Sequence, residues 1–104
     1  MSDFVPIAKV SDVPDPGKLT LEVEDEIVLL VHLDGKFYCI DDKCTHDGGP
    51  LGEGKLVGCE IACPRHGAKF DVRTGAALTM PATKATRTHE VRVDGDVVSV
   101  KLSA

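Results

Sequence analysis

The chain has 104 residues, of which 42% are hydrophobic, so it is long enough for one compact domain with a modest core. Its net charge of −5 argues against nucleic-acid binding, which depends on basic surfaces. The longest apolar run, Ile27 to Val31, is too short to span a bilayer, and the first residues do not resemble a signal peptide. We therefore expect a cytoplasmic monomer with no membrane partner.

Short runs with β character follow one another along the chain, separated by turn residues, and no long stretch has apolar residues at helical spacing. This pattern predicts an all-β fold, an antiparallel barrel or sandwich. Asp34-Gly35 and Asp94-Gly95 are expected to form the turns of two hairpins. The expected strands are Phe4 to Val10, Lys18 to Val23, Ile27 to Leu33, Lys36 to Ile40, Ile61 to Ala62, Ala68 to Val72, Thr86 to Val93 and Val97 to Leu102.

The middle of the chain differs from both ends in composition. Residues 41–83 are rich in Gly, Pro and Cys, which favours irregular loops carried on a rigid sheet. We expect a single domain over residues 1–104, in which a small loop-rich subdomain of about residues 41–83 is inserted into a β domain formed by residues 1–40 and 84–104.

Two short motifs in this middle region contain residue types that bind metals. Cys44-Thr45-His46 and Cys63-Pro64-Arg65-His66 are separated by sixteen residues. Thiolate and imidazole ligands from two tight loops form a mixed set of two Cys and two His, which suits zinc or an iron–sulfur cluster. A zinc finger keeps its cysteines together and its histidines together on a helix, whereas here Cys and His alternate between β-like flanks, which favours the cluster.

The remaining cysteines and histidines allow other ligand sets. Cys39 and Cys44 match the opening of the plant-type all-cysteine pattern, but its third position falls on Asp47. Cys39 and Cys59 are therefore interpreted as small buried hydrophobic residues. Two further histidines, His32 and His89, lie in strand-like runs with no ligand motif nearby, so we expect ordinary strand positions for them.

The two motifs together resemble the Rieske pattern C-x-H, a spacer, and C-x-x-H-G, and the likeness continues through Lys69 to Val72 and Thr74-Gly75. The resemblance covers nearly the whole chain. It implies one [2Fe-2S] cluster, with Cys44, His46, Cys63 and His66 as its ligands. Since four protein ligands saturate both irons, no position is left for a substrate, and electron transfer rather than catalysis is expected.

The residues around the motifs differ from those of Rieske proteins in respiratory complexes. Those proteins resemble CTHLGC with CPCHGSxY, where the extra cysteines form a disulfide and the Ser and Tyr hydroxyls bond to cluster sulfurs. The corresponding residues here are Gly49, Arg65, Ala68 and Phe70, none of which supplies a hydroxyl or a disulfide. Because hydrogen bonds to sulfur stabilise the reduced state, we predict a potential near the low end of the Rieske range, about −150 mV.

A free-standing, low-potential Rieske domain resembles the ferredoxin component of bacterial systems that hydroxylate aromatic rings. The resemblance implies a flavin-containing reductase as electron donor and a terminal oxygenase as acceptor. The first 60 residues carry a net charge of −8 and the remainder +3, an asymmetry that can orient a protein partner. Two alternatives stay open: a small Rieske-like subunit of an assimilatory nitrite reductase, and a zinc-bound or metal-free interaction module.

Overall fold

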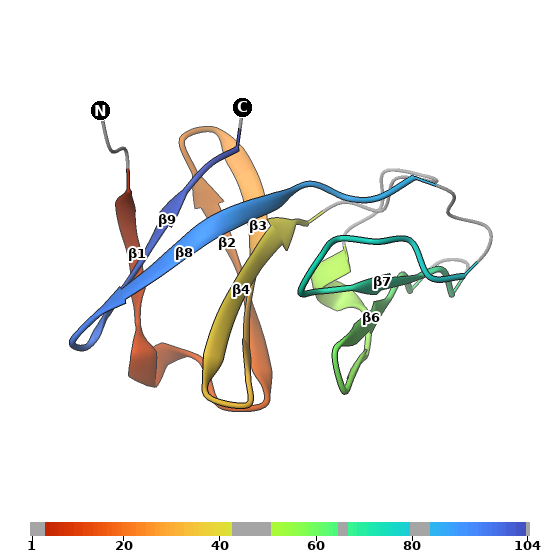
Figure 1. Cartoon of the computed structure of the whole chain (residues 1–104), viewed down its shortest axis with the longest axis horizontal. Helices are drawn as coiled ribbons and strands as arrows, with labels where there is room; N and C mark the ends of the chain where they lie inside the picture. The colour runs from red at the N-terminus through yellow and green to blue at the C-terminus, as the bar shows by residue number, and fades with distance from the viewer. Residues whose placement is uncertain (1–3, 43–50, 65–66, 80–83, 104) are drawn as a thin grey trace.

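The computed structural model describes residues 4–42, 51–64, 67–79 and 84–103. These residues form two antiparallel sheets, which lie side by side in Figure 1. In chain order the elements are β1 (Val5–Lys9), η1 (Val10–Asp12), β2 (Gly17–Val23), β3 (Glu26–Leu33), β4 (Lys36–Asp41), η2 (Leu51–Glu53), β5 (Leu56–Val57), β6 (Glu60–Ala62), β7 (Lys69–Asp71), β8 (Thr88–Asp94) and β9 (Val97–Lys101). The two η elements are single turns of 3₁₀-helix. The all-β prediction is confirmed.

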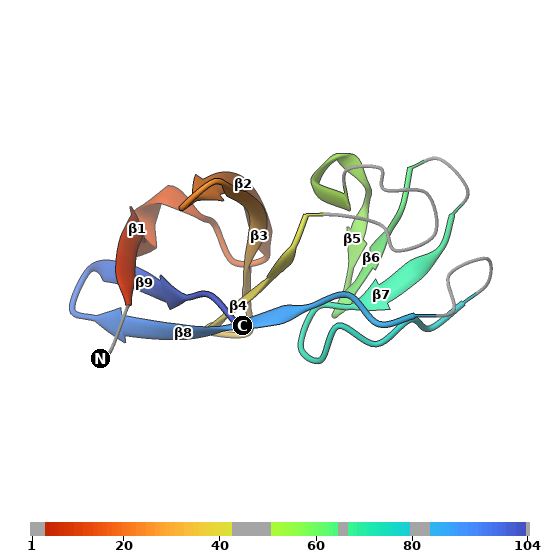
Figure 2. The same cartoon turned by 90° about the horizontal axis from the view of Figure 1, so that it is seen from above.

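The larger sheet has the strand order β1-β9-β8-β4-β3-β2 and curves into a nearly closed barrel, as Figure 2 shows. Two of its hairpin turns are the predicted ones, whereas the turn at Glu24 and Asp25 between β2 and β3 was not predicted. Asp34 and Gly35 both have positive φ angles, of 52° and 77°, as a tight hairpin turn requires, and Gly95 has a φ of 60° at the second turn. The smaller sheet has the order β5-β6-β7.

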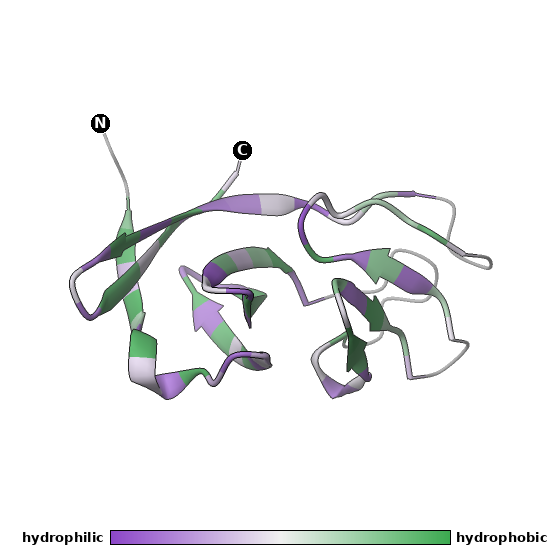
Figure 3. Cartoon of the chain, turned by 60° about the horizontal axis from the view of Figure 1, so that its bottom comes forward, coloured by the Kyte–Doolittle hydropathy of each residue, from purple (hydrophilic) through white to green (hydrophobic). Residues whose placement is uncertain are grey.

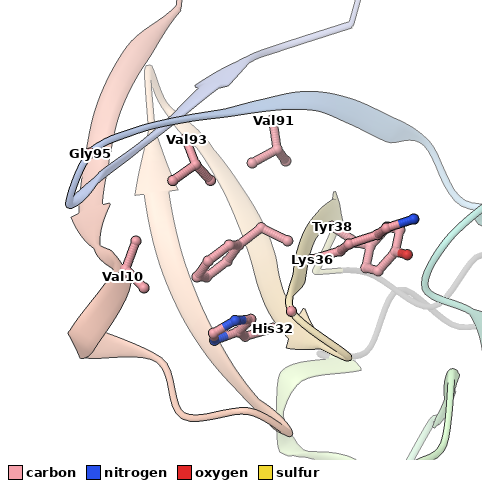
Figure 4. A pocket seen from close by; sticks show the side chains of 9 residues that line it. Val10, His32, Lys36, Tyr38, Val91, Val93 and Gly95 are labelled. Atoms are coloured by element: carbon pink, nitrogen blue, oxygen red, sulfur yellow. The ribbon is translucent and has the colours of Figure 1, made fainter.

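Strands β4 and β8 of the barrel pair over a short length only. These strands pair only at Cys39 with His89 and at Ile40 with Thr88, and beyond this point they diverge. A hollow opens there, lined by Val91 and Val93 of β8 and by Lys36 and Tyr38 of β4 (Figure 4). The predicted strand histidine His32 also lines this hollow; its Nδ1–H donates to the Val13 carbonyl at 2.9 Å and its ring stacks on Phe37.

Hydrophobic and hydrophilic residues alternate along β2 and β9, as Figure 3 shows, because each has one face on the core. In β9, where the alternation of the sequence places Val98 and Val100 on one face, both residues are fully buried. Strand β3 differs, since Val28 to Val31 are all fully buried. Its alternate residues enter two different clusters, one inside the barrel and one shared with the smaller sheet.

The shared cluster joins the two sheets. Leu29, Val31 and Ile40 come from the barrel, and Ile61 and Phe70 come from the smaller sheet, with η2 and the residues around β7 completing the cluster. Burial of this kind contributes about 25 cal/mol per Å² of apolar surface, so the smaller sheet is held on the barrel by a common core. The shared cluster therefore fixes the position of the smaller sheet on the barrel.

A buried polar network joins β4 to β8 where they pair. His89, the second predicted strand histidine, donates from Nε2 to the Asp41 carboxylate at 2.8 Å, because its Nδ1 accepts from the Ser103 backbone N–H at 3.0 Å. Arg87 contacts both Asp41 and Glu26. His89 thus has protein partners at both ring nitrogens, as an ordinary structural histidine does.

Some element boundaries differ from those predicted. The first strand ends at Lys9, because Val10 donates its N–H to the Asp96 carbonyl and starts η1. The strand β8 begins at Thr88 rather than Thr86, since the Thr86 N–H donates to the Gly75 carbonyl in the turn after β7. Strand β5 was not predicted.

Candidate metal centre

One of the four predicted ligands, Cys63, lies within the described residues; Cys44, His46 and His66 lie outside them. Cys63 directly follows β6, and its side chain is buried in the shared core. Among the described residues, no group of three or more His, Cys, Asp or Glu side chains is arranged to hold a metal ion. The four-residue ligand set as a whole therefore remains a prediction.

The backbone around Cys63 forms a tight turn. The Cys63 N–H donates to the Ala68 carbonyl at 2.7 Å, and the Gly67 N–H donates to the Cys63 carbonyl at 2.9 Å. Gly67 has a φ of 74°, a conformation that glycine adopts without steric cost. The turn places the Cys63 thiol at the end of a strand, next to Ala68, which is fully buried. A thiol fixed in this way is suited to be a thiolate ligand.

The segment after this turn is held by a carboxylate. Asp71, the last residue of β7, accepts from Arg73 Nε at 3.1 Å, from Arg73 Nη2 at 2.9 Å and from the Arg73 backbone N–H at 2.8 Å. These bonds lower the pKa of the Asp71 carboxyl below its usual value. The following turn needs a glycine at position 75, where φ is 78° and a Cβ atom would overlap the Thr86 carbonyl oxygen.

The lowered pKa of Asp71 gives a pH-dependent prediction. Because the pKa of Asp71 is lower in the folded protein than in the unfolded chain, the ionised carboxylate stabilises the fold. This stabilisation is complete above the unfolded pKa of about 3.9 and is lost as the pH falls through the folded pKa. We expect Asp71→Asn to lower the free energy of unfolding by about 1 kcal/mol at pH 7, because Arg73 is half-exposed and solvent screens the pair. The difference should shrink as the pH falls.

Thermal melting of the wild type and of Asp71→Asn at pH 7 and at about pH 2, well below the unfolded pKa, measures this effect. The matched control is Asp94→Asn, whose carboxylate is exposed and lies 4.0 Å from Arg92. It should leave the melting midpoint unchanged at both pH values. An equal midpoint difference for Asp71→Asn at both pH values contradicts the assignment.

Cys39 lies in the other hydrophobic cluster, inside the barrel. Burial, with a smaller contribution from Asp41, raises the pKa of the Cys39 thiol to about 12. Since the thiolate is the form that binds metals, this thiol is poorly suited to be a ligand. Cys59 is half-buried and packs against the shared core. Both positions agree with the interpretation of these cysteines as small hydrophobic residues.

Comparison with known proteins decides the family. The model of the Rieske [2Fe-2S] domain matches residues 3–99. The chain belongs to the Rieske [2Fe-2S] domain family. This match argues against the zinc-bound interaction module. It supports an iron–sulfur cluster as the type of cofactor, since the family is defined by a [2Fe-2S] domain.

The relatives of this Rieske domain include electron carriers. The chain is 37% identical over 92 residues to the ferredoxin component of a naphthalene 1,2-dioxygenase system from Pseudomonas aeruginosa, and the match covers 88% of each protein. The structure of the ferredoxin of carbazole 1,9a-dioxygenase from Nocardioides aromaticivorans IC177 superimposes with a TM-score of 0.93 at 30% identity, covering 98% of this chain and all of that one. The predicted fold and the likeness to ferredoxin components are thus confirmed.

A further solved structure contains such a ferredoxin with a partner. It is described as the complex of reduced oxygenase and oxidised ferredoxin in carbazole 1,9a-dioxygenase. The match has a TM-score of 0.88 at 30% identity and covers 96% of this chain and 94% of that one.

In the described part of this Rieske domain, no helix has the length and apolar character that crossing a membrane requires.

The donor set of the chain fits the cofactor of its family. Two cysteines and two histidines are the ligand types that a Rieske cluster uses, and the described one, Cys63, lies at the end of a strand with its backbone hydrogen-bonded to Gly67 and Ala68. Its neighbours Ala68 and Phe70 are fully buried, so Cys63 lies at the edge of a closely packed apolar core.

Proposed function

We propose that this protein is a one-electron carrier in which Cys44, His46, Cys63 and His66 bind one [2Fe-2S] cluster. When bound, such a cluster supplies a reversible one-electron couple. The observation that carries the proposal is the full-length match to ferredoxin components, together with Cys63 held in a tight turn on a buried strand end. Four protein ligands leave no coordination position for a substrate, which agrees with a carrier rather than an enzyme.

The close packing around Cys63 is suited to an electron carrier. The cysteine belongs to a core shared by two sheets, and packed cores of this kind resist rearrangement. A ligand that does not move keeps the reorganisation that accompanies electron transfer small. The small sheet, η2 and the loops near it are proposed to form the cluster-binding subdomain, about residues 41–83, on the β domain of residues 1–40 and 84–104.

We propose a terminal oxygenase of the ring-hydroxylating class as electron acceptor and a flavin-containing reductase as donor. The complex of a related ferredoxin with its oxygenase supports the acceptor. The donor follows from the need to reload the carrier after each electron. Transient redox interfaces bury less than about 1,200 Å², so we expect weak affinity, fast exchange and a monomeric carrier in the cytoplasm.

The test of this function is stopped-flow reoxidation of the dithionite-reduced protein by the oxygenase of a carbazole or naphthalene dioxygenase system. We expect the visible spectrum to return to its oxidised form at a rate that rises with oxygenase concentration and falls with salt. Cytochrome c serves as a non-physiological acceptor that shows whether the carrier is redox-active. Reoxidation by cytochrome c but by neither oxygenase would restrict the proposal to an electron carrier for another acceptor class.

The low potential of the carrier is predicted from two buried positions. Ala68 and Phe70 are fully buried at the places where related sequences carry Ser and Tyr hydroxyls, so neither can donate a hydrogen bond to sulfur. We expect Ala68→Ser to raise the reduction potential, since an added hydroxyl donor stabilises the more negative reduced state. Potentiometric titration measures the shift.

The control for that experiment is Ala77→Ser, a change of the same size at a residue that is only partly buried beside the shared core. It should leave the potential unchanged. An unchanged or lowered potential in Ala68→Ser would mean that the low potential has another origin.

A further inference from the structure

The sequence segment that carries Cys44 and His46 is flanked by Asp42 and Leu51. Asp42 is the last described residue before it, and Leu51, which begins η2, is the first described residue after it. Gly52, the second residue of η2, donates its backbone N–H to the Asp42 carboxylate. One side-chain hydrogen bond therefore joins the two ends of this ligand segment.

Both ends of this bond are themselves anchored. The Asp42 backbone N–H donates to the Ile27 carbonyl at 3.1 Å, which ties Asp42 to the start of β3. Leu51 is fully buried in the shared core, and its carbonyl accepts from the Gly54 N–H at 2.9 Å, which closes the η2 turn. The bond from Gly52 to Asp42 thus links two rigid parts of the protein.

A lysine from the edge of the barrel holds the same glycine. Lys18 in β2 donates from its ammonium group to the Gly52 carbonyl at 2.6 Å, across 34 positions of sequence. A hydrogen bond from a charged donor to a carbonyl is about twice as strong as one between neutral groups. Both polar groups of Gly52 are therefore bound, one by Asp42 and one by Lys18.

The space around Gly52 admits no side chain. A Cβ atom added there would overlap the Thr20 hydroxyl oxygen from β2 and would lie 3.1 Å from the nearer Asp42 carboxylate oxygen. Thr20 and Lys18 point toward η2 from the same strand, two residues apart, as the period of a β-strand allows. Glycine is thus required by the close approach of β2 to η2.

The second ligand turn contains backbone hydrogen bonds. The Gly67 N–H donates to the Cys63 carbonyl, and the Cys63 N–H donates to the Ala68 carbonyl. The ends of the first ligand segment are joined by the Asp42 side chain, and Lys18 ties one of these ends, Gly52, to β2. A substitution at either residue therefore changes the first segment while leaving the turn at Cys63 intact.

We propose that Lys18 and Asp42 are positioning residues that grip Gly52 and so keep Cys44 and His46 in place as cluster ligands. This inference rests on the proposed function, because it assigns a role toward the cluster. Lys18 acts on the cluster site from the edge strand of the barrel, although it is far from both ligand motifs in the sequence. The clamp, defined as Lys18, Asp42 and Gly52, governs retention of the cluster.

The test compares the rates at which purified holoprotein variants lose visible absorbance in excess EDTA. We expect Lys18→Met and Asp42→Ala each to lose the cluster about tenfold faster than the wild type, the factor expected from one charge-assisted hydrogen bond. Lys18→Arg and Asp42→Asn keep a donor and an acceptor and should stay within about twofold. The matched control is Lys9→Met, since Lys9 is an exposed lysine on β1.

Gly52→Ala provides an independent variant. The added methyl group should push η2 away from β2 and speed cluster loss, and the double variant Gly52→Ala with Thr20→Ala should recover part of the wild-type rate, because it removes the overlapping hydroxyl. Circular dichroism of each variant checks that the β fold is kept. In addition, the reduced Lys18→Met and Asp42→Ala proteins should give broader electron paramagnetic resonance lines, as variable ligand geometry produces.

The outcomes separate this inference from the proposed function. A wild type with a Rieske signal, and folded Lys18→Met and Asp42→Ala proteins that lose the cluster no faster than the Lys9→Met control, would overturn the clamp and leave the carrier function intact. A variant that does not fold also contradicts it, since the clamp predicts a folded barrel with a labile cluster. A wild type without a Rieske signal contradicts the function and the clamp together.

Discussion

Cys63→Ala is expected to yield a folded protein that contains no [2Fe-2S] cluster. The cysteine is buried at the end of β6, and replacing it by alanine removes the thiolate while changing little of the packing volume. With one iron ligand lost from a set of four, the visible absorbance and the iron content should fall to background. Iron analysis and the visible spectrum of the purified variant measure this directly.

The matched control is Cys39→Ala, which also removes a buried cysteine. Cys39 lies inside the barrel between β3 and β8, with a thiol whose pKa burial raises to about 12. Its loss should leave the visible spectrum and the iron content as in the wild type. A folded Cys39→Ala protein without colour, or a Cys63→Ala protein with a full cluster, would show that the ligand set is wrong.

Phe70→Ala is expected to have the largest effect on stability. The Phe70 side chain is fully buried, pairs across from Ile61 in the smaller sheet and belongs to the core shared with the barrel. Truncating a buried phenylalanine costs about 3–5 kcal/mol, since transfer energy is lost and a cavity remains. For a domain of this size the melting midpoint should fall by more than about 10 °C.

Val57→Ala is the control for that loss, because Val57 is also a strand residue of the smaller sheet but is 60% exposed. Its melting midpoint should stay within a few degrees of the wild type. If Phe70→Ala melted as Val57→Ala does, the smaller sheet would not depend on the shared core.

The hairpins and most strands could be predicted because their signals are local. Asp-Gly pairs between alternating runs specify tight turns, and both predicted turns are present. The alternation of apolar and polar residues over 97–102 also correctly predicts the buried face of β9, which includes Val98 and Val100. The metal-binding motifs are local signals of the same kind, since each places Cys and His within four residues.

Other features could not be predicted because they depend on distant parts of the chain. Both faces of β3 are buried because the smaller sheet covers the face that a lone barrel would expose. Strand β5 has only two residues, Leu56 and Val57, too few for any periodicity. The contact of Lys18 with Gly52 spans 34 residues and has no sequence signal, because one lysine in a strand resembles any other.

The central claim is that the chain binds a [2Fe-2S] cluster through two cysteines and two histidines. The electron paramagnetic resonance spectrum of the purified protein after dithionite reduction tests it most directly, because the average g value reports the ligands without any partner protein. We predict a Rieske-type signal, with an average g value below that of an all-cysteine cluster. A signal of the all-cysteine type would contradict the ligand set, and a colourless protein that contains zinc and gives no signal would contradict the electron carrier altogether.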